Sequence, residues 1–272
     1  MTSLRALATG VYAWIADEPR LGRPNAGVVL DADGATVIDT GCTPAQGATF
    51  AEAVEALGFP VRRIVLTGDH LEYTGGSTRF PMAAVFGTRV TSGRLDQPPQ
   101  PDVLRRLYPA EAADIDDEIT TRTVSHLVVE PAELTPALYG LPLAGQSLGN
   151  LVALVVGEGI LFAGALAWFG VTPLAFDGHP AAWAATLDSL ADLAPVVVPG
   201  HGPVGGPEDL RIQAAYLRAC VDAAGDPGAL PPGPWDTWPG REWDAVNVER
   251  AAMIRAGDGS VPPTMLRAVG LA

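Results

Sequence analysis

The sequence predicts a four-layer αβ/βα sandwich, in which two β-sheets pack face to face and helices cover the outer faces. Two observations favour this fold. Both halves of the chain follow one plan, in which short apolar strand patterns lead into a polar loop and then into a helix. The 272 residues are 48% hydrophobic and 18% charged, which is typical of a compact protein with a sizeable buried core.

In the first half of the chain, apolar runs rich in β-branched residues alternate with turn residues. We expect strands at Val11–Ile15, Ala26–Leu30, Ala35–Ile38, Val61–Leu66 and Val85–Gly87. A helix is expected over Pro44–Leu57, because Thr43 suits an N-cap and proline suits the first turn. From residue 92 to 118, a Pro-rich link and an acidic run, Glu111–Glu118, indicate an exposed helical insertion whose carboxylates are solvated.

The second half repeats this pattern. We expect strands at Thr123–Val129, Leu151–Val156, Ile160–Phe162 and Val196–Val198, and helices at Pro180–Leu193, Glu208–Ala224 and Trp243–Ala256. Two long uncharged stretches, 134–157 and 159–176, are interrupted by Pro and Gly, so we interpret them as buried strands and not as membrane spans. Residues 1–225 are expected to form one domain, on which a Pro- and Trp-rich segment with a helix, residues 226–272, is packed.

The composition excludes several functions. The net charge is −14 and all 17 basic residues are arginine, so nucleic acids and anionic membranes are not expected partners. The absence of lysine excludes Schiff-base chemistry. The two cysteines, Cys42 and Cys220, are expected to be reduced and buried, and no signal peptide is apparent, which favours a cytoplasmic protein. The tryptophans of the C-terminal segment are expected to pack over the domain or to form a homodimer contact.

Five segments resemble motifs of the metallo-β-lactamase superfamily, in the family's order and spacing. They are Val37–Gly41 (VIDTG), Thr67–Gly76 (TGDHLEYTGG), Leu143–Asn150 (LAGQSLGN), Ile160–Ala165 (ILFAGA) and Val197–Pro203 (VVPGHGP). The resemblance as a whole covers roughly residues 11 to 216. The resemblance implies the metallo-β-lactamase fold and, in an intact member, a dinuclear site, usually zinc, whose hydroxide hydrolyses an ester, thioester, lactone or amide.

This chain departs from the family at most of the metal-binding positions. Those positions hold Gly68, His70, Glu72, Tyr73, Gln146, Ala165 and His201. The resemblance implies that the first metal site keeps only His70. The second site keeps His201 and has Glu72, a longer carboxylate, in place of aspartate. Ala165 stands where the family has the bridging aspartate. Since zinc needs several donors converging at about 2 Å, we expect no dinuclear centre and no metal cofactor.

Three interpretations follow from the surviving residues. The first is a metal-independent enzyme for proton transfer, elimination, cyclisation or hydrolysis, acting on a small, largely uncharged metabolite in bacterial specialised metabolism. Its candidate catalytic residues are His70, His201, Glu72, Asp69 and Tyr73, and its candidate substrate-binding residues are Gln146, Trp168 and Phe169. The second is a non-catalytic ligand-binding or scaffold protein. The third is a mononuclear metallohydrolase with one zinc or iron on His70, Glu72 and His201.

Other polar residues fit structural roles. Asp39 is expected to bond the backbone of the loop that contains His70. His126 and His179 lie outside the motifs and are expected at the surface or at strand ends.

Overall fold

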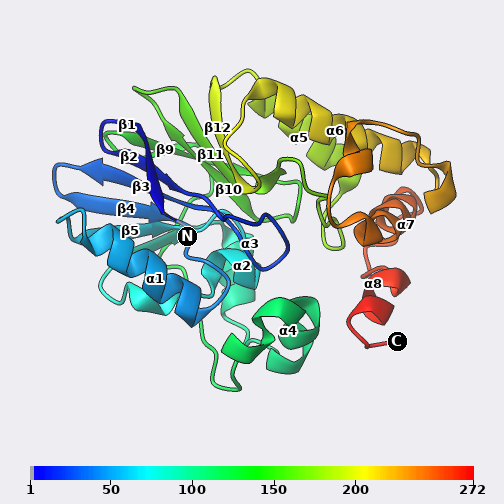
Figure 1. Ribbon diagram of the computed structural model, residues 1–272, viewed down its shortest axis with the longest axis horizontal. Coiled ribbons are helices and arrows are strands. Elements are labelled where there is room, and N and C mark those ends of the chain that lie inside the picture. Colours follow the sequence, from blue (N-terminus) through cyan, green and yellow to red (C-terminus); the bar gives the residue numbers. More distant parts are fainter. Residues whose placement is uncertain (1–2) are drawn as a thin grey trace.

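The computed structural model describes residues 3–272, which contain two β-sheets (Figure 1). The first sheet has seven strands in sequential order: β1 (Leu4–Ala8), β2 (Val11–Trp14), β3 (Ala26–Asp31), β4 (Gly34–Ile38), β5 (Val61–Val65), β6 (Ala84–Gly87) and β7 (His126–Leu127). Strands β1 to β4 pair antiparallel, and β4 to β7 pair parallel. The parallel strands therefore all end at the same edge of the sheet.

The second sheet has five strands in the order β12-β11-β10-β9-β8. They are β8 (Ala132–Thr135), β9 (Leu138–Leu143), β10 (Asn150–Val155), β11 (Ile160–Trp168) and β12 (Val196–His201). Only β11 and β12 pair in parallel in this sheet. All nine residues of β11 are buried, as expected for a central strand covered on both faces.

The helices lie outside the sheets. The α-helices are α1 (Pro44–Glu55), α2 (Leu71–Thr74), α3 (Arg89–Leu95), α4 (Pro101–Leu107), α5 (Pro180–Leu190), α6 (Pro207–Asp222), α7 (Asp244–Arg255) and α8 (Pro263–Ala268). Single 3₁₀ turns are η1 (Ser77–Arg79), η2 (Pro109–Asp114), η3 (Pro227–Ala229), η4 (Pro234–Thr237) and η5 (Arg241–Trp243). The Thr43 hydroxyl accepts a hydrogen bond from the backbone N–H of Gln46, so the predicted N-cap of α1 is confirmed.

Three apolar clusters separate the four layers. One lies between α1 and the first sheet and includes Phe50, Val37 and Ile64. A second joins the inner faces of the two sheets, and a third packs α5, α6 and α7 on the outer face of the second sheet. Along β4, Val37 faces α1 while Ile38 faces the second sheet, which is the alternation that a pleated strand requires. The four-layer αβ/βα prediction is therefore confirmed (Figure 1).

Several elements differ from the sequence expectations. Strand β1, helix α3 and helix α8 were not expected, and the long run 123–129 forms only the two-residue edge strand β7. The expectation of solvated carboxylates in the acidic run is wrong for Glu111. Its side chain is 2% exposed, because Arg20 and Arg23 from the loop between β2 and β3 fold over it.

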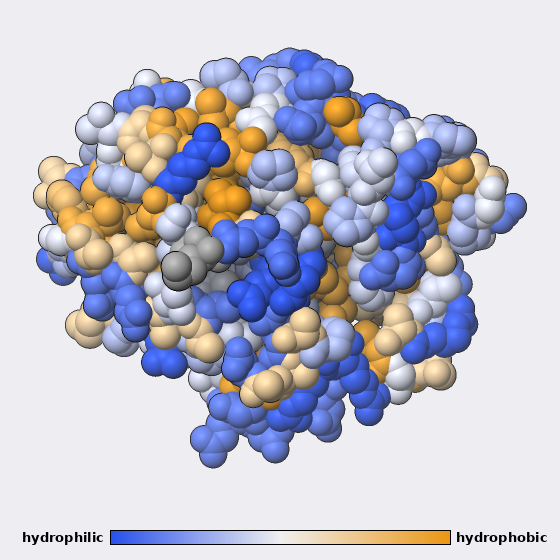
Figure 2. All heavy atoms as spheres, in the orientation of Figure 1, coloured by the Kyte–Doolittle hydropathy of each residue, from blue (hydrophilic) through white to orange (hydrophobic). Residues whose placement is uncertain are grey.

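The C-terminal segment packs on the same apolar core as the second sheet. Trp235 and Trp238 both contact Tyr216 of α6, with ring centroids 5.8 and 5.5 Å apart. Cys42 and Cys220 are buried and unpaired. In Figure 2, hydrophilic residues gather over the middle of the visible face, where the β2–β3 loop runs in Figure 1. Within residues 3–272, no helix combines the length and the apolar character needed to cross a membrane.

Candidate functional site

A buried carboxylate anchors the loop that follows β5. Asp39, at the end of β4 with φ 58°, accepts hydrogen bonds from the backbone N–H of Thr67 at 2.8 Å and from its hydroxyl at 2.6 Å. The Thr67 hydroxyl oxygen accepts a bond from the backbone N–H of Ala165 in β11. These bonds join the ends of β4 and β5 to the middle of β11 and set where the loop begins, as expected for Asp39. Burial raises the pKa of Asp39 to about 7.

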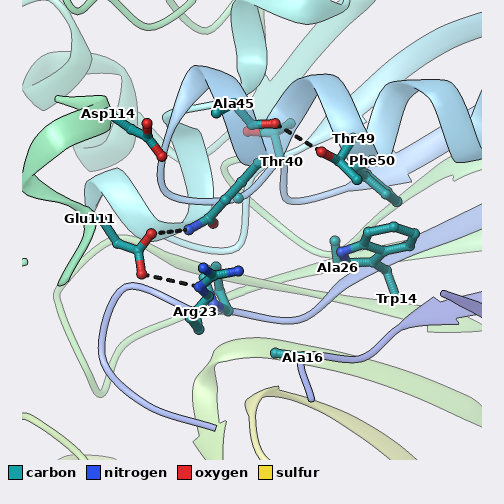
Figure 3. Close-up of a pocket in the computed structure, with 13 residues that line it drawn as sticks. Trp14, Ala16, Arg23, Ala26, Thr40, Ala45, Thr49, Phe50, Glu111 and Asp114 are labelled. Carbon is teal, nitrogen blue, oxygen red and sulfur yellow. Dashed lines mark hydrogen bonds and ion pairs between the residues drawn. The ribbon is translucent and has the colours of Figure 1, made fainter. Parts of the chain in front are cut away.

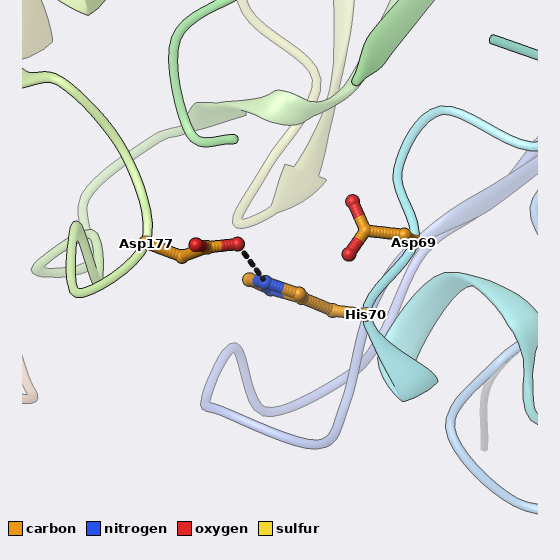
Figure 4. Close-up of side chains that lie close together, drawn as sticks. All are labelled: Asp69, His70 and Asp177. Carbon is orange, nitrogen blue, oxygen red and sulfur yellow. Dashed lines mark ion pairs between the residues drawn. The ribbon is translucent and has the colours of Figure 1, made fainter. Parts of the chain in front are cut away.

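The first group of polar side chains, which we call the His70 cluster, consists of Asp69, His70, Arg94 and Asp177. Figure 4 shows the histidine and the two aspartates. His70 Nδ1 lies 2.6 Å from the side-chain amide of Gln146, and its Nε2 lies 3.6 Å from Asp177 Oδ2. Arg94 of α3 bonds Asp177 through both terminal nitrogens and lies 3.2 Å from Asp69 Oδ2. The guanidinium thus occupies the space between the two carboxylates.

The charges of the His70 cluster favour its ionised forms. Burial opposes protonation of His70, but the nearby carboxylates, Asp177 foremost, outweigh burial and raise the pKa of the imidazole above its usual value. Burial also opposes ionisation of Asp177, yet His70 and Arg94 hold the pKa of this carboxyl well below its usual range. His70 therefore carries a proton more readily than a free histidine does.

The second group, which we call the His201 cluster, consists of Glu72, Tyr73, Trp168 and His201. Glu72 Oε1 lies 3.2 Å from His201 Nε2, and both side chains are fully buried. The backbone N–H of Gly22, in the β2–β3 loop, donates to Glu72 Oε1 at 2.7 Å. The Trp168 ring covers the imidazole of His201, with ring centroids 3.8 Å apart. The β2–β3 loop and Trp168 thus close this cluster off from solvent.

Tyr73 fills the space between the strand ends. Its ring is fully buried, and a Cβ atom added at Gly68 would lie 3.3 Å from Tyr73 Cδ2 and 3.0 Å from the methyl group of Ala165. A Cβ atom added at Gly200 would lie 3.2 Å from Tyr73 Cε1. Any residue larger than glycine at position 68 would therefore displace these neighbours. Burial raises the pKa of the Tyr73 hydroxyl well above its usual value.

Unpaired polar atoms are concentrated in these two clusters. Within residues 3–272, buried atoms without a hydrogen bond include His70 Nε2, the Tyr73 hydroxyl and both ring nitrogens of His201. His201 Nε2 is at ion-pair distance from Glu72 but is not aligned for a hydrogen bond. A buried polar group without a partner costs about 1–3 kcal/mol of stability. Buried polar atoms without a partner are uncommon in native proteins, so they mark these two clusters as candidate functional sites.

A dinuclear metal centre does not fit the residues at the positions that the resemblance assigns to metal ligands. Gly68 and Ala165 have no donor atoms, and the Gln146 amide is bonded to His70. Among the described residues, one group of three or more His, Cys, Asp and Glu donors lies within 4.8 Å, namely Asp69, His70 and Asp177. Glu72 and His201 do not join His70 in such a group, which disfavours the mononuclear set considered from the sequence.

The remaining sequence candidates lie in different surroundings. Trp168 lines a pocket of about 310 Å³, whereas Phe169 is buried and packed behind the turn at Gly202. His179 is the N-cap of α5, and His126 is an exposed residue of β7. Two members of the His70 cluster were missed by the sequence analysis, namely Arg94 and Asp177. No local pattern marks either residue, since both reach the cluster only through the tertiary fold.

Two larger pockets flank the β2–β3 loop. The pocket beside Trp168 is mostly apolar, and most of its other lining residues lie within segments 107–110, 171–172 and 239–243. It also contains Thr172, whose buried hydroxyl makes no hydrogen bond within the described chain. The other pocket, of about 350 Å³, lies on the opposite side of the loop beside Trp14 and Phe50 (Figure 3). Neither pocket is lined by His70 or His201.

Comparisons with known proteins agree with this architecture. A family model described as the metallo-beta-lactamase superfamily matches residues 19–201, more than half of the chain. No curated protein sequence matches it.

Solved structures with the same fold include three that cover most of the chain. The VMB-1 crystal structure at pH 5.5 is 21% identical and covers 80% of this chain and 97% of its own, with a TM-score of 0.63. The metallo-beta-lactamase FIM-1 from Pseudomonas aeruginosa in its mono-zinc form is 19% identical over 85% of this chain and 97% of its own, with a TM-score of 0.62. A metallo-beta-lactamase from Hirschia baltica is 22% identical over 79% and 97%, with a TM-score of 0.61. At these identities the likeness shows the fold.

Proposed function

The chain belongs to the metallo-β-lactamase superfamily, and within it we propose that the chain is a metal-independent acid–base enzyme. The observation that carries the proposal is the environment of His70. Its Nδ1 is held by Gln146, while its Nε2 faces Asp177 without a hydrogen bond. Its side chain is 11% exposed, whereas that of His201 is fully buried. His70 is therefore the less buried histidine of the two, although its Nε2 atom is itself covered in this structure.

The chemistry assigned to His70 is proton transfer at Nε2. A half-turn of the Gln146 amide presents its oxygen to Nδ1–H and leaves Nε2 as the basic nitrogen. When Nε2 takes a proton from the substrate, Asp177 stabilises the imidazolium, which is the direction in which the pKa of His70 is shifted. Such a positioned base typically accelerates proton transfer by about 10²–10⁴-fold. Elimination, isomerisation, cyclisation and hydrolysis all use this step.

We place the substrate in the pocket beside Trp168, whose ring also covers His201. Its mostly apolar lining suits a small and largely uncharged molecule. Arg20 and Glu242 also line it, and because the Arg20 guanidinium is paired with Glu111, the described residues of the pocket offer no free cation to an anionic substrate. A chain with arginine as its only basic residue suits a GC-rich bacterial genome, and we place the reaction in specialised metabolism.

The test combines metal analysis with turnover. Purified untagged protein is expected to contain no stoichiometric zinc, iron or manganese and to keep its turnover of neutral esters, lactones or C–H acids in the presence of a chelator. The His70→Ala variant should lose that turnover by about 10²-fold or more, while His126→Ala, at an exposed position in β7, should retain it. One tightly bound metal per chain together with chelator-sensitive turnover would refute the proposal.

A second candidate function is ligand binding without catalysis. It is favoured by the fact that neither of the two larger pockets is lined by His70 or His201. In that case a ligand of the Trp168 pocket binds to wild type and to His70→Ala with similar affinity, and no substrate of the screen is turned over.

A further inference from the structure

We propose that the pocket beside Trp14 binds a free α-amino acid with an apolar side chain. This site is separate from both histidine clusters and does not depend on the enzymatic proposal. The pocket has a volume of about 350 Å³ and is enclosed by the β2–β3 loop, the start of α1 and the turn η2. That volume falls in the range of small-molecule sites, about 300–1,000 Å³.

One end of the pocket is apolar. Trp14 and Phe50 lie side by side with ring centroids 5.6 Å apart, and Ala26 also lines the pocket. Figure 3 shows Trp14, Phe50 and Ala26 on one side of the pocket and the charged groups on the other. A ligand that fits this arrangement needs an apolar or aromatic part and a separate polar part.

The polar end contains a guanidinium held in place from behind. The buried carboxylate of Glu111 bonds Arg23 Nε at 3.1 Å, Arg20 at 2.7 Å and the Gln46 amide at 3.0 Å. Because Arg23 uses Nε for this bond, its two terminal amino groups stay available to a ligand. A guanidinium fixed in this way binds a carboxylate through two parallel hydrogen bonds.

The polar end also contains a carboxylate. Asp114 follows Glu111 in the turn η2 and lines the same pocket, and its exposed side chain makes no hydrogen bond or ion pair within residues 3–272. In Figure 3 the Asp114 carboxylate and the Arg23 guanidinium lie on different sides of the polar end. Glu111 is already balanced by two arginines. The pocket therefore presents one cation and one anion to a ligand, which matches the carboxylate and ammonium groups of a zwitterion.

Calorimetric titration with L-phenylalanine tests the assignment, with 3-phenylpropionate and phenethylamine as probes that each lack one charged group. We expect L-phenylalanine to bind and each single-charge probe to bind at least about tenfold more weakly, because each loses one charge-assisted contact. L-Serine, which lacks the apolar part, should bind more weakly as well. Absence of binding by L-phenylalanine at millimolar concentration, or equal binding of 3-phenylpropionate, would overturn the proposal.

Variants locate the site. Arg23→Gln and Asp114→Asn should each weaken L-phenylalanine binding by about tenfold or more. Arg62→Gln and Asp222→Asn change the same residue types at exposed positions outside the pocket and should leave the affinity within about twofold. Since Asp114 has no partner in the described chain, Asp114→Asn is expected to fold normally even if Arg23→Gln does not. Unchanged affinity in Asp114→Asn would contradict the assignment.

Discussion

Replacing Tyr73 with phenylalanine removes one buried hydroxyl and leaves the ring that fills the space between the strand ends. In the folded protein this hydroxyl makes no hydrogen bond, whereas in the unfolded chain it bonds to water. Folding therefore removes a hydrogen bond that nothing replaces. Removing such a group recovers about 1–3 kcal/mol of stability. For a chain of this size, each kcal/mol corresponds to a rise in Tm of about 2–4 °C. We therefore expect Tyr73→Phe to be more stable than wild type in both urea and thermal unfolding.

Tyr216 provides the matched control. Its hydroxyl donates to Asp244 at 2.6 Å and accepts a bond from Asn247 at 2.9 Å. Tyr216→Phe removes one buried hydrogen bond from each partner and should lower the unfolding free energy by about 1–3 kcal/mol. The two substitutions thus change stability in opposite directions. If Tyr73→Phe destabilises the protein as Tyr216→Phe does, the Tyr73 hydroxyl has a partner in solution and the inference from its lack of a bond is wrong.

Three further predictions concern the same region. The pKa of Asp39 is raised from 3.8 to about 7, so between these pH values the native state retains a proton that the unfolded chain releases. The free energy of unfolding should therefore decline by up to about 4 kcal/mol as pH rises from about 4 to 7. Urea unfolding of Asp39→Asn should lack this component, and parallel pH profiles of variant and wild type would argue against it. In the Arg94→Ala variant, zinc should bind to Asp69, His70 and Asp177 and raise the unfolding free energy, by about 2.7 kcal/mol when zinc is at a hundred times its Kd. Zinc should not stabilise an Arg94→Ala/Asp177→Asn double variant in the same thermal unfolding assay. Gly68→His should lower the free energy of urea unfolding by about 1–3 kcal/mol, and by less in a chain that also carries Tyr73→His. An equal loss of stability in both backgrounds would show that the Tyr73 ring does not fill this space.

The fold could be predicted from the sequence because its signals are local. Runs such as Val61–Leu66 combine β-branched residues with flanking turns, and Thr43 with Pro44 marks a helix start whatever packs against it. The run at 123–129 was overestimated for a related reason. It is strand-like in composition, but it lies at the edge of the sheet, where only His126–Leu127 pair.

The candidate site could be predicted only in part. The positions of His70, Gln146 and His201 follow from motifs that surround them in sequence. Arg94 reaches Asp177 across 83 residues, and nothing in their neighbouring residues indicates that contact. Glu111 looked like one member of a solvated acidic run, yet it is buried because arginines 88 or more residues earlier fold over it. Charge pairs formed by tertiary contacts leave no mark on local composition.

The arginine of the His70 cluster has a consequence for how the protein depends on its surroundings. A metal ion that balances two carboxylates is in exchange with the medium, so its occupancy follows concentration, competing ions and chelators. The charge that balances Asp69 and Asp177 is covalently attached to α3 and is synthesised with the chain. Each molecule therefore contains this positive charge, whatever the metal concentration of the medium. Under the proposed function, the geometry of the cluster does not depend on metal homeostasis in the cell that makes it.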